Sequence, residues 1–315
     1  MFKNAIIYSV SGLPVVAAAL AEALAPELYH PCDPSQERAT GWAPPRGEAH
    51  GELLEAVGGH WVGCFIIESR SVPGDVIRKR TEELAAKIEQ KTGRKPGKTE
   101  RRDLRDDARQ GLQPHAFSRI RTVWVWIDPV RGWVVVDTSS QAVADTVVTS
   151  LVKALPRGFQ IKLLQTAISP LARMVEWLAA DACDGLPGDL ELGRAVELRG
   201  TGDEAARVRL NNHDLGTDEV RQHVAQGKLP VSLALSHAGR VGFVLTHALQ
   251  LRGIRLLDIA LDAADHDSAD RFDAEVALTT GELRATIDAL LAALAEADVD
   301  TDAKTPKRLG VTVAA

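Results

Sequence analysis

The chain has 315 residues, of which 45% are hydrophobic and 25% are charged, and its formal net charge is −6. This length and composition predict a globular protein with one large or two to three smaller domains. No apolar run reaches the roughly 18 residues of a membrane span, which excludes a membrane-spanning protein, and we expect the protein in the cytoplasm.

The N-terminal part alternates between strand and helix patterns. We predict a strand at 2–10, a helix at 14–25, a polar loop at 30–51, a short helix at 52–57 and a strand at 61–67. Pro14 suits the first turn of its helix, because that position needs no backbone N–H donor.

A basic stretch follows, and it is the most unusual part of the chain. Residues 78–121 contain 14 Lys and Arg against 7 Asp and Glu, so the remaining residues sum to −13. Apolar residues recur at helical spacing on both sides of Gly93–Gly97, which predicts two helices joined by a turn. Each helix has one narrow apolar stripe. We therefore expect a helical hairpin, the arm, that projects from a larger body.

The positive surface of this arm predicts a polyanionic partner, and nucleic acid is the commonest one. The candidate DNA-binding residues are Arg78, Lys79, Arg80, Lys87, Lys91, Arg94, Lys95, Lys98, Arg101, Arg102, Arg105, Arg109, Arg119 and Arg121. Two other interpretations stay open. The charges could only solvate the helices, or the arm could dock an acidic protein partner, with the chain acting as a scaffold.

The remaining pattern predicts a strand hairpin at 122–127 and 132–136, a helix at 142–155, a strand at 159–164 and a helix at 170–180. Strands follow at 190–198, 206–210, 231–236, 241–246 and 253–258, with a helix at 218–226 among them. A strand at 271–278 and a helix at 280–295 end the pattern. Strands beside helices without βαβ regularity predict an α+β fold with antiparallel or mixed sheets. We expect a central domain (1–72 with 122–182), the arm (73–121) and a C-terminal domain (183–315).

No motif predicts an enzyme, a cofactor or a metal site. Gly93–Thr99 resembles a phosphate loop, but its glycines have three residues between them instead of four, and a helix precedes it instead of a strand. The acidic group Asp262, Asp265, Asp267 and Asp270 lacks the glycine and the bidentate glutamate of an EF-hand. Three cysteines without metal or redox spacing indicate free thiols: Cys32, Cys64 and Cys183.

Phe117 lies among cations just after the second arm helix, with His115, Arg119 and Arg121 nearby. Two interpretations remain open for it. It could pack into the local core, or it could be a contact tip that meets its own copy across a two-fold axis.

Collinear motifs spread over nearly the whole chain resemble the bacterial recombination-associated RdgC family. They are Gly41–Pro45, Lys98–Glu100, Pro114–Arg119, Trp126–Asp128, Val136–Asp137, Glu176–Trp177, Asp214–Leu215, Gly227–Lys228, Leu233–Leu235, Arg271–Asp273 and Thr280–Leu283.

The resemblance implies a curved monomer and a homodimer that closes into a ring around double-stranded DNA. It implies binding without marked sequence preference, association with the nucleoid, restraint of the RecA recombinase, and no enzymatic activity. It places Phe117, with His115 two residues before it, in one ring-closing contact. A second contact corresponds to Asn212 and His213, where the family has a Lys-Gln pair that this chain lacks.

Overall fold

The computed structural model describes the chain except for residues 49, 156, 181–185, 201–205, 258–270 and 296–315. Its strands are β1 Asn4–Ser11, β2 Arg38–Ala43, β3 Leu54–Val57, β4 His60–Arg70, β5 Ser118–Asp128, β6 Trp133–Val136, β7 Gln160–Leu163, β8 Leu190–Arg199, β9 Arg207–Asn211, β10 Leu229–His237, β11 Val241–Thr246 and β12 Gln250–Leu256. Its α-helices are α1 Ala17–Leu24, α2 Gly74–Thr92, α3 Lys98–Leu112, α4 Gln141–Ala154, α5 Pro170–Ala179, α6 Asp218–Ala225 and α8 Arg271–Ala293, and short 3₁₀ turns lie at Ala25–Glu27 and Gln113–His115.

The strands form one 12-stranded sheet in the order β2-β4-β5-β6-β1-β12-β11-β10-β8-β9, with β3 beside β4 and β7 beside β1. Every pair of these strands is antiparallel. The first strand lies in the middle, because β1 pairs with β6 on one side and with β7 and β12 on the other. An antiparallel sheet with separate helices confirms the predicted α+β class.

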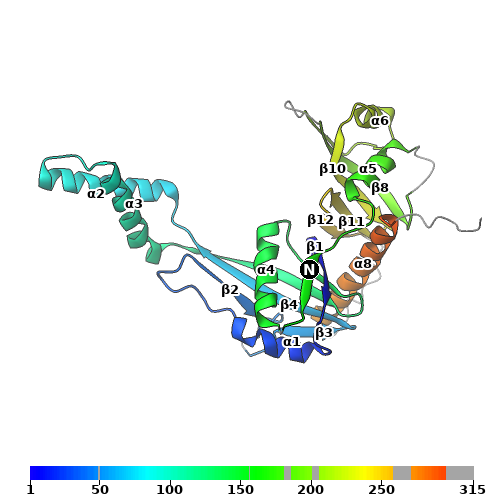
Figure 1. Cartoon of the computed structure of the whole chain (residues 1–315), viewed down its shortest axis with the longest axis horizontal. Helices are drawn as coiled ribbons and strands as arrows, with labels where there is room; N and C mark the ends of the chain where they lie inside the picture. Colours follow the sequence, from blue (N-terminus) through cyan, green and yellow to red (C-terminus); the bar gives the residue numbers. More distant parts are fainter. Residues whose placement is uncertain (49, 156, 181–185, 201–205, 258–270, 296–315) are drawn as a thin grey trace, which may run out of the picture.

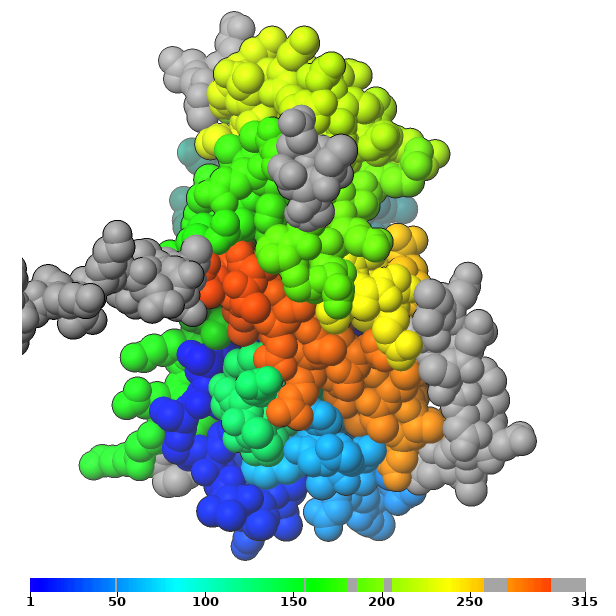
Figure 2. All heavy atoms as spheres, turned by 90° about the vertical axis from the view of Figure 1, so that its right-hand side faces the viewer, coloured from blue at the N-terminus to red at the C-terminus, as the bar shows by residue number. Residues whose placement is uncertain are grey.

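Helices cover opposite faces of this sheet in its two halves. Along β5, Val123, Val125 and Ile127 point to the face covered by α1 and α4, whereas Trp126 points to the opposite face, on which α8 packs beside β3 and β4. This division follows from the two-residue period of a strand. Figure 2 shows α8, in orange, lying between the blue N-terminal part of the chain and the green to yellow part that precedes α8 in the sequence.

The longest strand pair leads away from the body to the arm. β4 and β5 pair continuously from Trp61 opposite Ile127 to Arg70 opposite Ser118. Figure 1 shows α2 and α3 beyond this ribbon, at one end of the long axis, with α6 and α8 towards the other end. The molecule therefore has an elongated, curved outline.

The structure corrects the prediction of a helix at 52–57. Leu54–Val57 is strand β3, which forms a hairpin with β4 through Gly58 and Gly59. Both glycines have positive φ, 58° and 84°, the conformation that a two-residue hairpin turn requires and that glycine adopts without strain. The predicted loop at 30–51 also contains a strand, β2, at the outer edge of β4.

The predicted strand at 271–278 is also wrong, because these residues begin helix α8. Phe272, Ala274 and Val276 alternate with the charged Arg271, Asp273 and Glu275 and so imitate a strand. The helical period prevails because Val276 continues into a buried stripe with Leu283, Ile287 and Leu290 that packs on the sheet. The predicted free thiols are found at Cys32 and Cys64, both buried, while Cys183 and the acidic group at 262–270 lie outside the described residues.

Candidate nucleic-acid interface

The turn between α2 and α3 is closed by defined local contacts. Gly93 ends α2 with a positive φ of 73°, a common helix ending that glycine permits. Glu100, in the first turn of α3, accepts a hydrogen bond from the Gly97 backbone N–H at 2.8 Å and pairs with Arg94 at 2.7 Å. Hydrogen bonds from the Arg94 guanidinium and, to a smaller extent, from the Gly97 N–H lower the pKa of Glu100 to about 2.

The two arm helices pack through a narrow apolar seam. Its buried members are Ile77 and Ala85 of α2 and Leu104 and Ala108 of α3. Because the seam contains only two large side chains, the rest of each helix surface stays available to solvent or to a partner. Of the apolar stripe expected on the first arm helix, Ile77 is buried and Val76 is 41% exposed, whereas Leu104 and Ala108 of the second helix are both buried as expected.

Most of the arm cations have no acidic partner. Arg80 pairs with Glu83 at 3.0 Å, Arg94 with Glu100, and Arg109 approaches Glu37 at 3.8 Å. Within the described part of the chain, the other cations of α2, α3 and their turn make no ion pair: Arg78, Lys79, Lys87, Lys91, Lys95, Lys98, Arg101, Arg102 and Arg105. Unpaired exposed cations keep their full charge available to a polyanion.

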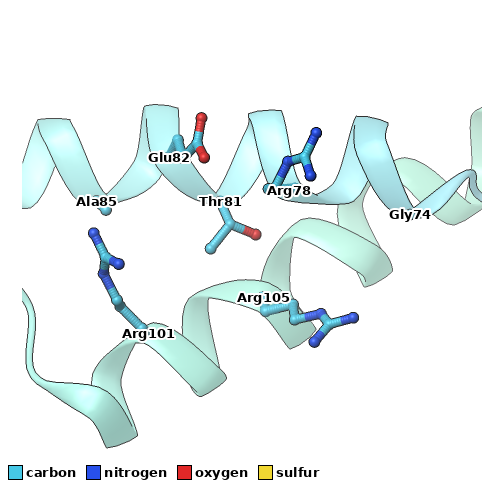
Figure 3. Close-up of a pocket in the computed structure, with 7 residues that line it drawn as sticks. All are labelled: Gly74, Arg78, Thr81, Glu82, Ala85, Arg101 and Arg105. Carbon is cyan, nitrogen blue, oxygen red and sulfur yellow. The ribbon is translucent and has the colours of Figure 1, made fainter.

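An open groove of about 430 Å³ runs between the arm helices. Gly74, Arg78, Thr81, Glu82 and Ala85 line it from α2, and Arg101 and Arg105 line it from α3. Figure 3 shows Arg101 reaching from α3 towards Ala85, whereas Arg105 extends along α3 and away from Arg101.

The last two predicted DNA-binding residues lie on the sheet and not on the arm helices. Arg119 and Arg121 stand opposite Ser69 and Ile67 at the exposed start of β5. The Arg121 guanidinium donates to the Thr138 hydroxyl at 2.9 Å. They therefore belong to the ribbon that carries the arm, outside the groove.

A buried polar cluster fixes the base of the arm. The carboxylate of Glu68, only 3% exposed, accepts hydrogen bonds of 2.7 Å from the Cys32 backbone N–H and from the Tyr29 hydroxyl. Both hydrogen bonds lower the pKa of Glu68, and the one from the Cys32 backbone has the larger effect. Burial, with the neighbouring carboxylate, raises the pKa of Tyr29 to about 12. Gln113, at the end of the arm, donates to the backbone carbonyls of Gln36 and Arg70.

Phe117 does not pack into the local core. Its side chain is 93% exposed, and Ile120, three residues later, is 62% exposed. The core interpretation is therefore wrong. His115 ends the short 3₁₀ turn just before it. An almost fully exposed phenylalanine next to a second exposed apolar residue is a feature of contact sites.

Asn212 and His213 follow β9 at the other end of the sheet. Asn212 has a positive φ of 53°, and its side-chain oxygen accepts a 3.0 Å hydrogen bond from Arg194. The Nδ1 of His213 lies 2.6 Å from its neighbour's carbonyl, that of Asp214, and its Nε2 lies 3.7 Å from Glu219. The structure does not bring this pair into contact with Phe117 within one chain.

Sequence reasoning missed a second group of cations on β8 and β9. Arg207 and Arg209 both pair with Glu197, at 3.1 and 2.7 Å, and Arg199 stands opposite Arg207. Their charge holds the pKa of Glu197 below its ordinary value, with the Arg209 hydrogen bond as the largest cause. The signal was the alternation of Arg207, Val208 and Arg209, which places both arginines on one face of a strand.

Among the described residues, no group of three or more His, Cys, Asp and Glu side chains is arranged to hold a metal ion. None of the described helices combines the length and the apolar character needed to cross a membrane.

Comparison with known proteins identifies the relatives of this chain. A family model described as "Putative exonuclease, RdgC" matches residues 1–297. The chain belongs to the RdgC family. It is 38% identical over 297 residues to the recombination-associated protein RdgC of Janthinobacterium sp. (strain Marseille), and 36% identical over 297 residues to that of Herminiimonas arsenicoxydans. The RdgC of Dechloromonas aromatica (strain RCB) is 33% identical over 300 residues. Each alignment covers 93% of this chain and 97% of the relative.

The name of the family and the names of the relatives suggest different functions. The family description names an exonuclease, whereas the relatives are named for their association with recombination. The association with recombination agrees with the resemblance derived from the sequence.

Proposed function

We propose that this protein binds double-stranded DNA through its backbone, without sequence preference, as a ring-closed homodimer that restrains RecA-dependent recombination. The proposal rests on one observation above all: the arm carries a set of exposed cations without acidic partners, although the chain as a whole is acidic. Such cations contact phosphates and carry little sequence information.

The arginines of β8 and β9 would extend this contact surface. Arg207 and Arg209 share the single carboxylate of Glu197, so this group and Arg199 retain a net positive charge. Lys and Arg side chains from both the arm and the sheet would then face the duplex, while most acidic residues would remain outside.

Two contact regions at opposite ends of a curved monomer fit a closed dimer. The exposed Phe117 lies between α3 and β5, and Asn212 with His213 lies between β9 and α6. Figure 1 shows α3 at one end of the molecule and α6 towards the other. A two-fold axis would bring each region against its own copy, and two such contacts close a ring. A ring leaves DNA by opening or by sliding off a free end.

A protein that occupies DNA in this way would restrain recombination by competing with the recombinase for the same DNA. A recombinase must reach DNA to assemble on it, and a protein that covers the backbone competes for the same phosphates. We therefore expect the purified protein to slow RecA-dependent strand exchange in proportion to the DNA it covers, without consuming any substrate.

Binding to linear duplex DNA over a range of salt concentrations, beside binding to closed circles, tests this function. We expect a steep loss of affinity with salt, similar affinities for unrelated sequences, and slower release from circles than from linear DNA. Equal release rates would contradict encirclement. No binding at low salt would contradict the DNA function and favour a scaffold that docks an acidic protein. Release of nucleotides that requires a divalent metal would instead support the exonuclease description.

A further inference from the structure

Two neighbouring loops of the body present exposed apolar side chains away from the arm. The loop after β1, residues 12–16, and the β5–β6 turn, residues 129–132, together line an open hollow of about 300 Å³. Val15 is 95% exposed, Val16 is 55% exposed and Val130 is 78% exposed. We call these two loops the valine patch. Grouped apolar side chains on a protein surface mark contact sites, whereas single ones need no explanation.

Local contacts hold both loops in fixed positions. The Val10 N–H donates to the Gly132 carbonyl at 2.8 Å, and a Cβ at Gly132 would lie only 2.9 Å from the Val10 carbonyl oxygen. The carboxylate of Asp128 accepts hydrogen bonds of 3.0 and 2.9 Å from the backbone N–H groups of Val130 and Arg131. The patch is therefore preorganised, which lowers the entropy that would be lost on binding a partner.

Val16 occupies a position at which valine is a poor choice for stability. It is the N-cap of α1, and no side chain caps this helix. Ser, Thr, Asp and Asn accept hydrogen bonds from the free N–H groups at such a position, whereas valine cannot. The first turn of α1 also contains no acidic residue. The positive end of this helix is therefore left without a negative charge, next to the exposed valines.

A cation adds to this positive charge from a third loop. A Cβ at Gly12 would lie 2.6 Å from the carbonyl oxygen of Gly158, so the loop that precedes β7 touches the patch. Arg157, next to Gly158, is exposed and makes no ion pair with any described residue. Arg131, in the β5–β6 turn, is already paired with Asp288 at 2.7 Å. The uncompensated charge beside the valines is therefore positive.

We infer that the valine patch is a docking site for a partner protein, which binds through an extended segment that carries apolar side chains next to carboxylates. The apolar side chains enter the hollow, which is large enough for a few of them, and the carboxylates face Arg157 and the start of α1. Charge complementarity therefore selects an acidic segment over a basic one.

The patch lies apart from the surfaces already proposed to bind DNA or a second copy. Figure 1 shows α1, which begins directly after Val16, at the lower edge of the body, with α2 and α3 at one end of the molecule and α6 towards the other. A protein that holds DNA with its arm therefore leaves the patch open to a partner. The inference does not depend on the proposed DNA function.

Selection from a library of short random peptides displayed on phage tests the site. The library is first passed over the double variant Val15→Ser with Val130→Ser, which removes peptides that bind elsewhere, such as on the basic arm. It is then selected on the unsubstituted protein, and the enriched peptides are synthesised with a fluorescent label. We expect these peptides to combine aliphatic or aromatic residues with Asp and Glu.

The affinities of the labelled peptides are then compared by fluorescence anisotropy. The valine double is expected to bind them at least ~10-fold more weakly than the unsubstituted protein. Val152→Ser with Leu163→Ser is the matched control, because these residues are also exposed and apolar but do not line the hollow. The control is expected to change the affinity less than ~2-fold. Arg157→Glu is expected to weaken binding at least ~3-fold.

Thermal unfolding, duplex binding and self-association of the valine double are expected to match those of the unsubstituted protein. No enrichment after the first step, or enriched peptides that lack carboxylates and are insensitive to Arg157→Glu, would overturn the inference. Loss of self-association in the valine double would show that a second copy covers the patch, which would also overturn it. Failure of the unsubstituted protein to bind duplex DNA would overturn the proposed function and leave the docking site standing.

Discussion

Arg94 and Glu100 hold the α2–α3 turn together through two parallel hydrogen bonds of 2.8 and 2.7 Å. Because Glu100 also accepts from the Gly97 N–H, one carboxylate serves both as the cap of α3 and as the partner of the turn arginine. Its pKa is lowered from an ordinary value of 4.5 to about 2. A lowered carboxylate pKa means that this contribution is complete above pH 4.5 and is lost as the pH falls through about 2.

The first prediction concerns this turn. In protein labelled at glycine, the Gly97 amide signal is expected to stay constant on acidification past pH 4.5 and to shift only towards pH 2. Glu100→Gln is expected to abolish that titration, because the amide side chain keeps a hydrogen-bond acceptor but has no charge. A midpoint near 4.5 in the unsubstituted protein would contradict the paired geometry.

Phe117→Ala is expected to weaken the proposed homodimer and leave the folded monomer unchanged. The side chain is almost fully exposed in the single chain, so its removal leaves no cavity. At an interface, loss of a buried phenylalanine typically costs ~2 kcal/mol or more, which raises the dissociation constant at least ~10-fold. Sedimentation equilibrium measures the association, and thermal unfolding measures the fold.

Val130→Ala provides the matched control, because Val130 is another strongly exposed apolar residue, in the turn between β5 and β6. The dissociation constant for self-association of the Val130→Ala variant is expected to stay within ~2-fold of that of the unsubstituted protein. Equal weakening by both substitutions would argue that self-association depends on general surface hydrophobicity and not on Phe117.

Charge reversal on α3 is expected to disrupt DNA binding. Changing Lys98, Arg102 and Arg105 to Glu removes three unpaired cations and adds three negative charges on the surface proposed to bind DNA. If all three lie within reach of phosphates, the salt slope is expected to shrink by about 2 to 3. The measurement is duplex binding at several salt concentrations. Affinity that survives at moderate salt would show that the arm is not the DNA surface.

Leu104→Ala is expected to loosen the arm without unfolding the body. Leu104 supplies one of the two large side chains of the apolar seam, and its truncation typically costs ~2–3 kcal/mol when the site is buried. Few other contacts replace it there, so hydrogen exchange in α2 and α3 is expected to accelerate. Leu245→Ala, in the core of the sheet, is the contrasting variant and is expected to lower the thermal midpoint of the whole protein.

A buried histidine predicts sensitivity to acid. His60 accepts a 3.2 Å hydrogen bond from the Trp126 indole N–H and lies near the fully buried Asp128, which also faces Arg284 at 3.3 Å. Burial lowers the pKa of His60, and the nearby Arg284 cation adds to this effect while Asp128 opposes it. A lowered histidine pKa means that the unfolded chain takes up a proton more readily than the folded one, so stability falls as the pH drops below 6.5.

His60→Asn is the test, because its side-chain oxygen can take the place of Nδ1 but does not titrate. Between about pH 8 and about pH 5, we expect the thermal unfolding midpoint of the variant to decrease less than that of the unsubstituted protein. An identical loss in both proteins would show that other groups determine the acid sensitivity.

Features with a local physical cause were predictable from the sequence. The arm helices were predicted because Leu104 and Ala108 repeat at helical spacing, and their turn because glycine ends α2 at Gly93. The strand at 271–278 was predicted wrongly because its alternation was local, whereas the contacts that favour α8 come from strands far away in the sequence.

The site was only partly predictable for the same reason. The sequence contains the number of cations but not their partners, so it could not distinguish Arg94, which pairs with Glu100 across the turn, from the unpaired Arg101. The exposure of Phe117 likewise depends on the direction in which β5 leaves the arm. Strand alternation could have placed Arg207 and Arg209 together, but not Glu197 between them.

The position of β1 in the middle of the sheet has a consequence for how the protein is made. Its partners β6, β7 and β12 end at residues 136, 163 and 256, so the first strand leaves the ribosome long before the last of them exists. The part of β1 that pairs with β12 therefore stays unpaired until residue 256 has been made, and unpaired strand edges are prone to pair wrongly. We expect the nascent chain to depend on chaperones until β12 emerges, and an N-terminal fusion that restrains Met1 to lower the yield of folded protein.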